Sequence, residues 1–118
     1  MREPDPLGEL TQILEAISRI HDYVEGLDEA SFCSSAKDVD SVAMNLIVIG
    51  EAVRCLKPEI LALEPSIRWS SIIAVRNRIA HGYSMMQRPL VWAIVSKDLP
   101  NLQAATLRLI AHIRLGRQ

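Results

Sequence analysis

Apolar residues recur every three or four positions along most of this chain, and that periodicity limits its fold more than any other feature. A period near 3.6 residues lines one face of an α-helix with apolar side chains, whereas a half-buried strand needs them at every second position. The periodic segments cover residues 6–26, 38–57, 70–81 and 89–113, and no alternating stretch of useful length interrupts them. The pattern predicts an all-α fold: an up-and-down four-helix bundle with a short additional helix at residues 59–63.

Prolines and glycines mark the expected ends of these helices. Pro6 and Pro89 are placed as first-turn prolines, which cost the helix no hydrogen bond. Pro100 falls inside the last periodic segment and should kink or interrupt it, because it removes an internal donor. We expect Gly82 to adopt the left-handed conformation that stops the third helix. Residues 27–37 are expected to form a polar connection.

The two halves of the chain carry opposite charge. Residues 1–64 contain 13 acidic and 5 basic residues, a net charge of −8, and residues 65–118 contain 1 acidic and 8 basic residues, a net charge of +7. Between Pro65 and Lys97 there are four arginines and one lysine without any Asp or Glu. Such a segment favours anions. Alternatively, the basic half packs against the acidic half of the same chain or of a second copy.

Length and composition restrict the class of protein. With 118 residues the chain is expected to form one domain, 1–118, with a single core. No apolar run approaches the roughly 18 residues of a membrane span, and the first residues lack an apolar signal core, so we expect a cytoplasmic protein without a membrane partner. Cys33 and Cys55 lack metal-type spacing, and no Gly-rich phosphate loop occurs; neither a metal nor a cofactor is expected.

The candidate site is the run of residues 76–83 at the end of the third helix. Arg76 falls within the apolar stripe of that helix, and a guanidinium there needs an anionic partner or a ligand. Glu51 is the candidate partner; the alternative is that it is a solvated charge. Asn77 and His81 are four residues apart and so share a helix face, and Tyr83 follows. The stripe itself is expected to comprise Trp69, Ile72, Ile73 and Ala80.

Arg76, His81 and Tyr83, spaced as Arg, four residues, His, one residue, Tyr, resemble the motif of the HEPN superfamily, specifically its HepT-like ribonuclease toxins. The resemblance covers nearly the whole chain and includes residues 14–20, 45–52, 69–83 and 91–102. One departure is Ala74, where relatives commonly have glycine; it removes no functional group. The resemblance implies a HEPN-like helical bundle.

The resemblance also implies a metal-independent RNA endonuclease, the toxin of a type II toxin–antitoxin system whose antitoxin is an MNT-type nucleotidyltransferase. RNA supplies its own nucleophile, the 2′-hydroxyl, so RNA rather than DNA is the expected substrate. His81 can transfer the proton, and Arg76 can hold the phosphoryl oxygens. Asn77 would bind the phosphate or orient His81, and Arg78 and Arg88 are expected to contact RNA phosphates.

A general base and a general acid are both needed, yet the site of one chain offers a single histidine. Two copies of His81 facing each other across a homodimer would supply the pair, as the family implies. The homodimer should be built mainly on the third and fourth main helices.

In the family, the tyrosine of the motif accepts AMP from the nucleotidyltransferase, so Tyr83 is the expected acceptor. The alternative for this side chain is packing beside Met85 with its hydroxyl at the surface. Two other interpretations of the chain stay open. It could be a non-catalytic binding partner of a nucleotidyltransferase, or a plain helical dimerisation protein.

Overall fold

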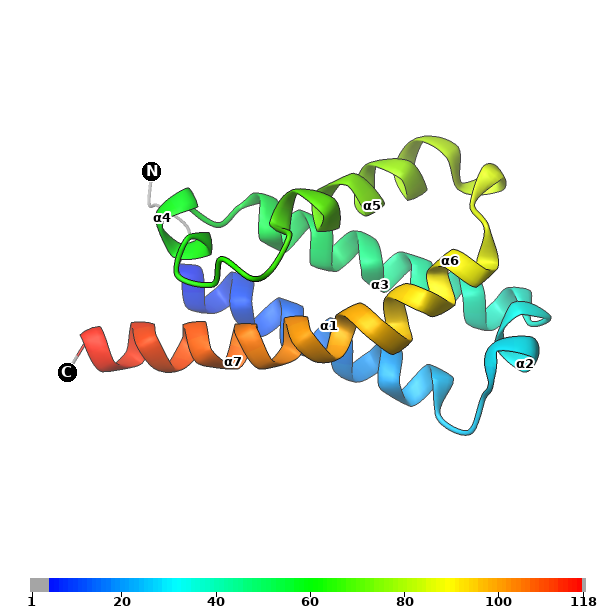
Figure 1. The fold of residues 1–118 in the computed structure, drawn as a ribbon, viewed down its shortest axis with the longest axis horizontal. Coiled ribbons are helices and arrows are strands. Elements are labelled where there is room, and N and C mark those ends of the chain that lie inside the picture. The colour runs from blue at the N-terminus through cyan, green and yellow to red at the C-terminus, as the bar shows by residue number, and fades with distance from the viewer. Residues whose placement is uncertain (1–4, 118) are drawn as a thin grey trace.

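The computed structural model describes residues 5–117, and most of them lie in helices (Figure 1). No strand occurs in that part of the chain, so the predicted all-α class is confirmed. A 3₁₀ turn at Tyr83–Met85 and a π-helical turn at Ile94–Asp98 join some of the helices. The helices are α1 (Pro6–Val24), α2 (Glu29–Cys33), α3 (Ala36–Arg54), α4 (Pro58–Leu61), α5 (Trp69–Gly82), α6 (Arg88–Ala93) and α7 (Leu99–Gly116).

Helix α3 lies at the centre of the bundle and packs against both α1 and α5, while α7 packs against α1 (Figure 1). The core between α1, α3 and α7 contains fully buried side chains such as Ile13, Ile17, Val42, Ile49 and Leu109. Helix α5 buries only Trp69 and Ile79 and presents the rest of its length partly or fully to solvent. The third helix of the predicted bundle is therefore a peripheral helix, which suits a surface site.

Capping chemistry explains the helix ends. Asp5 accepts a hydrogen bond from the backbone N–H of Leu7 at 3.0 Å, and Pro6 occupies the first turn of α1 as predicted. Gly26, with φ of 79°, adopts the left-handed conformation just after that helix. The first-turn position predicted for Pro89 is also confirmed, in α6.

The expected polar connection before α3 is wrong over five of its residues, because these form helix α2. Asp28 and Ser31 cap its start reciprocally: the Asp28 carboxylate accepts from the Ser31 backbone at 2.8 Å, and the Ser31 hydroxyl accepts from the Asp28 backbone at 2.9 Å. Phe32 is fully buried and its ring lies 5.3 Å from that of Trp92 in α6. Capping and one buried ring stabilise a helix too short to show a periodicity.

The expectation for Gly82 is also wrong. Its φ is −156°, outside the left-handed region, and it forms the last residue of α5. The chain then continues into the 3₁₀ turn, which closes through a hydrogen bond from the Met86 N–H to the Tyr83 carbonyl at 2.9 Å. A tightened last turn satisfies terminal carbonyls without a left-handed residue, so the glycine was not needed for the stop.

The predicted interruption by Pro100 is confirmed and takes a specific form. The π-helical turn precedes α7, and the Leu99 N–H bonds to the Ile94 carbonyl five residues back. Pro100 then occupies the first turn of α7, where its missing donor costs no bond. The last periodic segment is thus α6, a π turn and α7 in near continuity (Figure 1). Among the described residues no helix is long and apolar enough to span a membrane.

Candidate functional site

Helices α3 and α5 pack closely at Gly50, and this approach positions the site. A Cβ atom placed on Gly50 would lie 2.3 Å from Cβ and 2.9 Å from Cγ of Arg76, and 3.4 Å from the carbonyl oxygen of Ile72. Ordinary carbon–carbon contacts need about 3.5–4.0 Å. Only glycine therefore lets the backbone of α5 come this near, and it brings Arg76 directly against α3.

Arg76 finds its anionic partner beside that glycine. Its Nε atom lies 2.6 Å from Oε1 of Glu51, and the two side chains are 24% and 37% exposed. The two facing atoms are themselves shielded from solvent. The other oxygen of Glu51 accepts from Nη2 of Arg54 at 3.0 Å. The contact expected between Glu51 and Arg76 is thus present, rather than the solvated charge that was its alternative.

Asn77 contacts Arg76 and not His81. Its Oδ1 atom accepts a hydrogen bond from Nη1 of Arg76 at 3.0 Å. The contact with His81 that would orient the imidazole is not formed among the described residues, and the expected contact of this amide with an RNA phosphate stays a prediction. Arg76 is therefore held from two sides, by a carboxylate of α3 and by the amide of its own neighbour.

The buried stripe of α5 differs from the expected one at its end. Ile79 is buried at 4% exposure, whereas Ala80 is exposed. Positions 72, 76 and 79 alternate steps of four and three, the spacing that keeps side chains against a neighbouring helix at a small crossing angle. An average of 3.6 residues per turn counted from Trp69 gives Ala80 instead, because it ignores the direction of α3.

His81 lies in the last turn of α5 and its side chain is exposed. It is four residues beyond Asn77, so the two side chains share one face of the helix. Arg78 is exposed on the same helix. The structure therefore presents an imidazole, an amide and the guanidinium of Arg78 to solvent on α5, while the guanidinium of Arg76 lies against α3.

Tyr83 follows in the 3₁₀ turn, and its hydroxyl donates a hydrogen bond to Oδ1 of Asp40 on α3. Partial burial, together with the hydrogen bond and negative charge of Asp40, raises the pKa of Tyr83 to about 12, and Arg88 opposes the rise. The residue as a whole is 40% exposed. Asp40 was not predicted, although a signal existed: it lies 11 residues before Glu51, about three helical turns, and so shares its helix face. The phenol is anchored to α3 rather than packed only beside Met85.

The sequence of this chain matches the model of a known protein family. The model of the family described as ribonuclease HepT-like matches residues 13–109, which includes every residue of the motif. The chain belongs to the HepT-like ribonuclease family. No solved structure matches it significantly.

Named relatives agree with that assignment. Over 104 residues, 88% of this chain, it is 29% identical to a protein of Methanocaldococcus jannaschii named as a gamma-glutamylcyclotransferase and, provisionally, an RNase. The match covers 47% of that relative, so the chain spans about half of its length. A second protein of that organism, provisionally named an RNase, is 29% identical with 86% of this chain and 84% of the relative covered. The "Probable ribonuclease HepT" of Thermococcus cleftensis is 28% identical over 80% and 86% of the two chains.

The charge asymmetry of this HepT-like protein is partly satisfied internally. Ion pairs join the acidic half to the basic half: Glu51 to Arg76, Glu64 to Arg108 at 2.6 Å, and Asp5 to Arg117 at 3.0 Å. The alternative explanation of the asymmetry, packing of one half on the other, therefore applies to these arginines. Arg88 is engaged as well, because its Nη1 atom donates to the carbonyl of Cys33 at 2.7 Å and so ties α6 to the end of α2.

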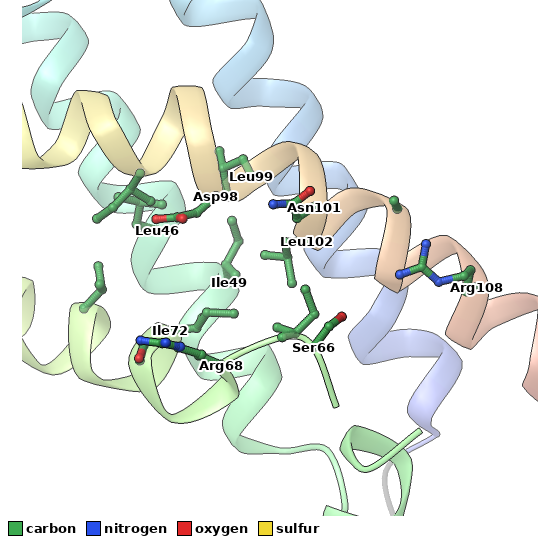
Figure 2. Close-up of a pocket in the computed structure, with 15 residues that line it drawn as sticks. Leu46, Ile49, Ser66, Arg68, Ile72, Asp98, Leu99, Asn101, Leu102 and Arg108 are labelled. Carbon is green, nitrogen blue, oxygen red and sulfur yellow. The ribbon is translucent and has the colours of Figure 1, made fainter. Parts of the chain in front are cut away.

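A pocket of about 660 Å³ opens between α3, α5 and the π turn with α7 (Figure 2). Leu46, Ile49 and Ile72 contribute apolar surface, and Arg68 and Asp98 are among its polar residues. None of the motif residues lines it, so the pocket is distinct from the predicted site. Among the described residues no group of three or more His, Cys, Asp or Glu side chains could hold a metal ion.

Proposed function

We propose that this HepT-like protein is a metal-independent RNA endonuclease that acts as the toxin of a type II toxin–antitoxin system. The observation that carries the proposal is the cation Arg76, fixed by Glu51 and Asn77, with His81 exposed one turn further along α5. Membership of a family of ribonucleases and the RNase names of its relatives support the reaction type. The proposed active unit is a single helical domain.

The chemistry needs few groups. The 2′-hydroxyl of RNA attacks the adjacent phosphorus, and the 5′-oxygen of the next nucleotide leaves. His81 is the proposed proton-transfer group, and Arg76 stabilises the charge that develops on the phosphoryl oxygens. A guanidinium has five N–H donors. Glu51 pairs with Nε by charge and Asn77 accepts one N–H of Nη1, so neither contact engages Nη2, which is left for a phosphate.

The proposed active form is a homodimer that brings two copies of His81 together as base and acid. His81 supports this part because its side chain is exposed in the last turn of the peripheral helix α5, where a second copy can approach it. Light scattering should find a dimer at micromolar concentration. A monomer with full nuclease activity would contradict the two-histidine scheme.

The proposed control is transfer of AMP to Tyr83 by an MNT-type nucleotidyltransferase antitoxin. Tyr83 lies two residues after His81 and is 40% exposed, so a second protein can reach it. Attached AMP would place a phosphate and a nucleoside next to the motif and exclude RNA by charge and volume. Intact-mass spectrometry should show adducts in steps of one AMP that disappear in Tyr83→Phe.

The decisive experiment is RNA cleavage by purified variants. Arg76→Ala and His81→Ala should each lower the cleavage rate by about 100-fold or more, because each removes a group that acts only as the transition state forms. His112→Ala is the matched control, since His112 is also exposed but lies on α7 away from the motif. Chelation by EDTA should change nothing.

Each other outcome has a definite meaning. Full cleavage by His81→Ala, or loss of cleavage in EDTA, would contradict the mechanism. RNA binding by the wild-type protein without cleavage would instead favour the alternative, a non-catalytic partner of a nucleotidyltransferase.

A further inference from the structure

The contact between Tyr83 and Asp40 is unexplained by RNA cleavage, since neither residue is needed for the proton transfers of that reaction. It joins the 3₁₀ turn after α5 to the first half of α3, across 43 positions of sequence. Both residues are exposed in part, so the contact lies at the surface and not in the core. A hydrogen bond at such a place contributes little to stability, which invites a chemical explanation.

In the hydrogen bond between Tyr83 and Asp40 the tyrosine is the donor and the carboxylate is the acceptor. The phenol donates its only proton to the carboxylate, which leaves the lone pairs of the Tyr83 oxygen available to an electrophile. A nucleophilic hydroxyl and a base within hydrogen-bond reach form the usual arrangement for activating a nucleophile. In protein kinases an aspartate likewise accepts the proton of the hydroxyl that is phosphorylated.

The surroundings of the hydroxyl are open enough for a second protein. Met85, two residues after Tyr83, is 83% exposed, and Met44, one helical turn after Asp40 on α3, is 60% exposed. Exposed methionines form adaptable apolar contacts with partner proteins. Each residue of the pair thus has an exposed methionine near it in the sequence, which a modifying enzyme could contact.

We propose that Asp40 is a catalytic residue of the modification of Tyr83, contributed by the protein that is modified. This rests on the proposed function, in which Tyr83 accepts AMP from ATP. The Tyr83 oxygen forms a bond to the α-phosphorus, the bond from that phosphorus to the bridging oxygen of the β-phosphate breaks, and pyrophosphate leaves. The proton of the hydroxyl moves to the Asp40 carboxylate, which is exposed and returns it to solvent.

With Asp40 as the proton acceptor, the two proteins divide the chemistry of the transfer between them. The nucleotidyltransferase need bring only ATP and Mg²⁺ to the phenol, because the proton acceptor is already in place on the substrate protein. Tyr23 on α1 has no such carboxylate bonded to its hydroxyl among the described residues, so it should not be modified.

The test uses Asp40→Asn, which keeps the shape of the side chain and an acceptor oxygen but removes the basic carboxylate. Asp38→Asn is the matched control: it makes the same change two residues away, in the first turn of the same helix. Each full-length protein is incubated with ATP, Mg²⁺ and an MNT-type nucleotidyltransferase, and adducts are followed by intact mass under single-turnover conditions. Asp40→Asn should be modified about 100-fold or more slowly than the wild-type protein, and Asp38→Asn at the wild-type rate.

The pH dependence of the modification rate distinguishes two roles for Asp40: accepting the proton of Tyr83, or only holding the 3₁₀ turn in place. In Asp40→Asn hydroxide must replace the carboxylate, so its slow rate should rise about tenfold per pH unit relative to the wild-type protein and to Asp38→Asn. Modification of Asp40→Asn at the wild-type rate or faster would overturn the assignment. A slow rate with the same pH dependence as the wild-type protein and Asp38→Asn would overturn it too.

A pH titration tests the hydrogen bond between Tyr83 and Asp40 without the nucleotidyltransferase. In a Tyr23→Phe background, phenolate absorbance reports Tyr83 alone. The pKa of Tyr83, raised to about 12 by burial first and by Asp40 second, should fall in Asp40→Asn, although the remaining burial keeps it above its ordinary value, and it should stay in place in Asp38→Asn. An unchanged titration would show that Asp40 does not hold the hydroxyl, and would overturn the assignment.

If the wild-type protein forms no adduct at Tyr83, the proposed control by AMP fails and the assignment fails with it. If adducts form equally on both proteins, only the role of Asp40 fails.

Discussion

Replacing Gly50 by alanine should separate α3 from α5 and disable the site at the same time. The new methyl carbon would start 2.3 Å from Cβ of Arg76, so the two helices must move apart by about 1 Å to restore an ordinary contact. The obstructing atoms belong to the base of the arginine side chain and not to its flexible end. Rotation of Arg76 alone therefore cannot relieve the clash.

The size of the effect follows from two opposed terms. Overpacking of this kind costs about 1–3 kcal/mol, while alanine is about 1 kcal/mol more favourable than glycine within a helix. The close approach of two carbons and a carbonyl oxygen places the strain toward the upper end of its range, for a net loss of about 1–2 kcal/mol. For a chain of 118 residues this lowers the melting temperature by about 4–8 °C.

Gly8→Ala is the control, because a Cβ at Gly8 in α1 meets nothing within 4 Å. It tests the helix-propensity term alone and should leave stability unchanged or slightly higher. Urea unfolding followed by circular dichroism measures both variants, and the RNA cleavage assay should show a larger loss for Gly50→Ala than its fraction unfolded explains. If Gly50→Ala were as stable as Gly8→Ala, the close approach of the two helices would not be as described.

Two further predictions concern the segment before α5. Trp69→Phe should lower the free energy of unfolding by about 1–3 kcal/mol, because the indole Nε1 donates to the carbonyls of Leu61 at 3.0 Å and Glu64 at 3.2 Å. An unchanged urea midpoint would refute this role. The hydrogen bonds of Arg108 hold the pKa of Glu64 below its ordinary value, so the stabilisation is present above the unfolded-state pKa of about 4.3 and is lost as pH falls through the lower folded-state pKa. Glu64→Gln should consequently flatten the loss of stability below about pH 4 in urea titrations, and an equally steep loss in both proteins would contradict the pairing.

The main helices were predictable because each has an apolar face long enough to show its period. Helix α2 was not, since its five residues depend on the reciprocal caps of Asp28 and Ser31 and on burial of Phe32. Gly82 shows a related limit: a glycine permits a left-handed stop but does not require one. Capping and turn geometry are local, yet several outcomes are compatible with the same residues.

The candidate site was predictable only along one helix. The unusual position of Arg76 in an apolar face pointed to an anionic partner, and Glu51 is the partner in the structure. Asp40 was missed because its contact with Tyr83 depends on the angle at which α3 and α5 cross, which periodicity does not specify. Gly50 could have indicated that crossing, because a glycine inside a helical pattern often marks a close approach of backbones.

The ion pair between Asp5 and Arg117 brings the start of α1 and the end of α7 together at one end of a molecule that extends 48 Å along its longest axis. The turn carrying Tyr83 lies at the opposite end (Figure 1). A fluorophore, affinity tag or tether attached near either of those residues would therefore leave the Tyr83 end uncovered. A circular permutation that links Arg117 to Asp5 through a short loop should likewise preserve the bundle, because the end of α7 already lies beside the start of α1.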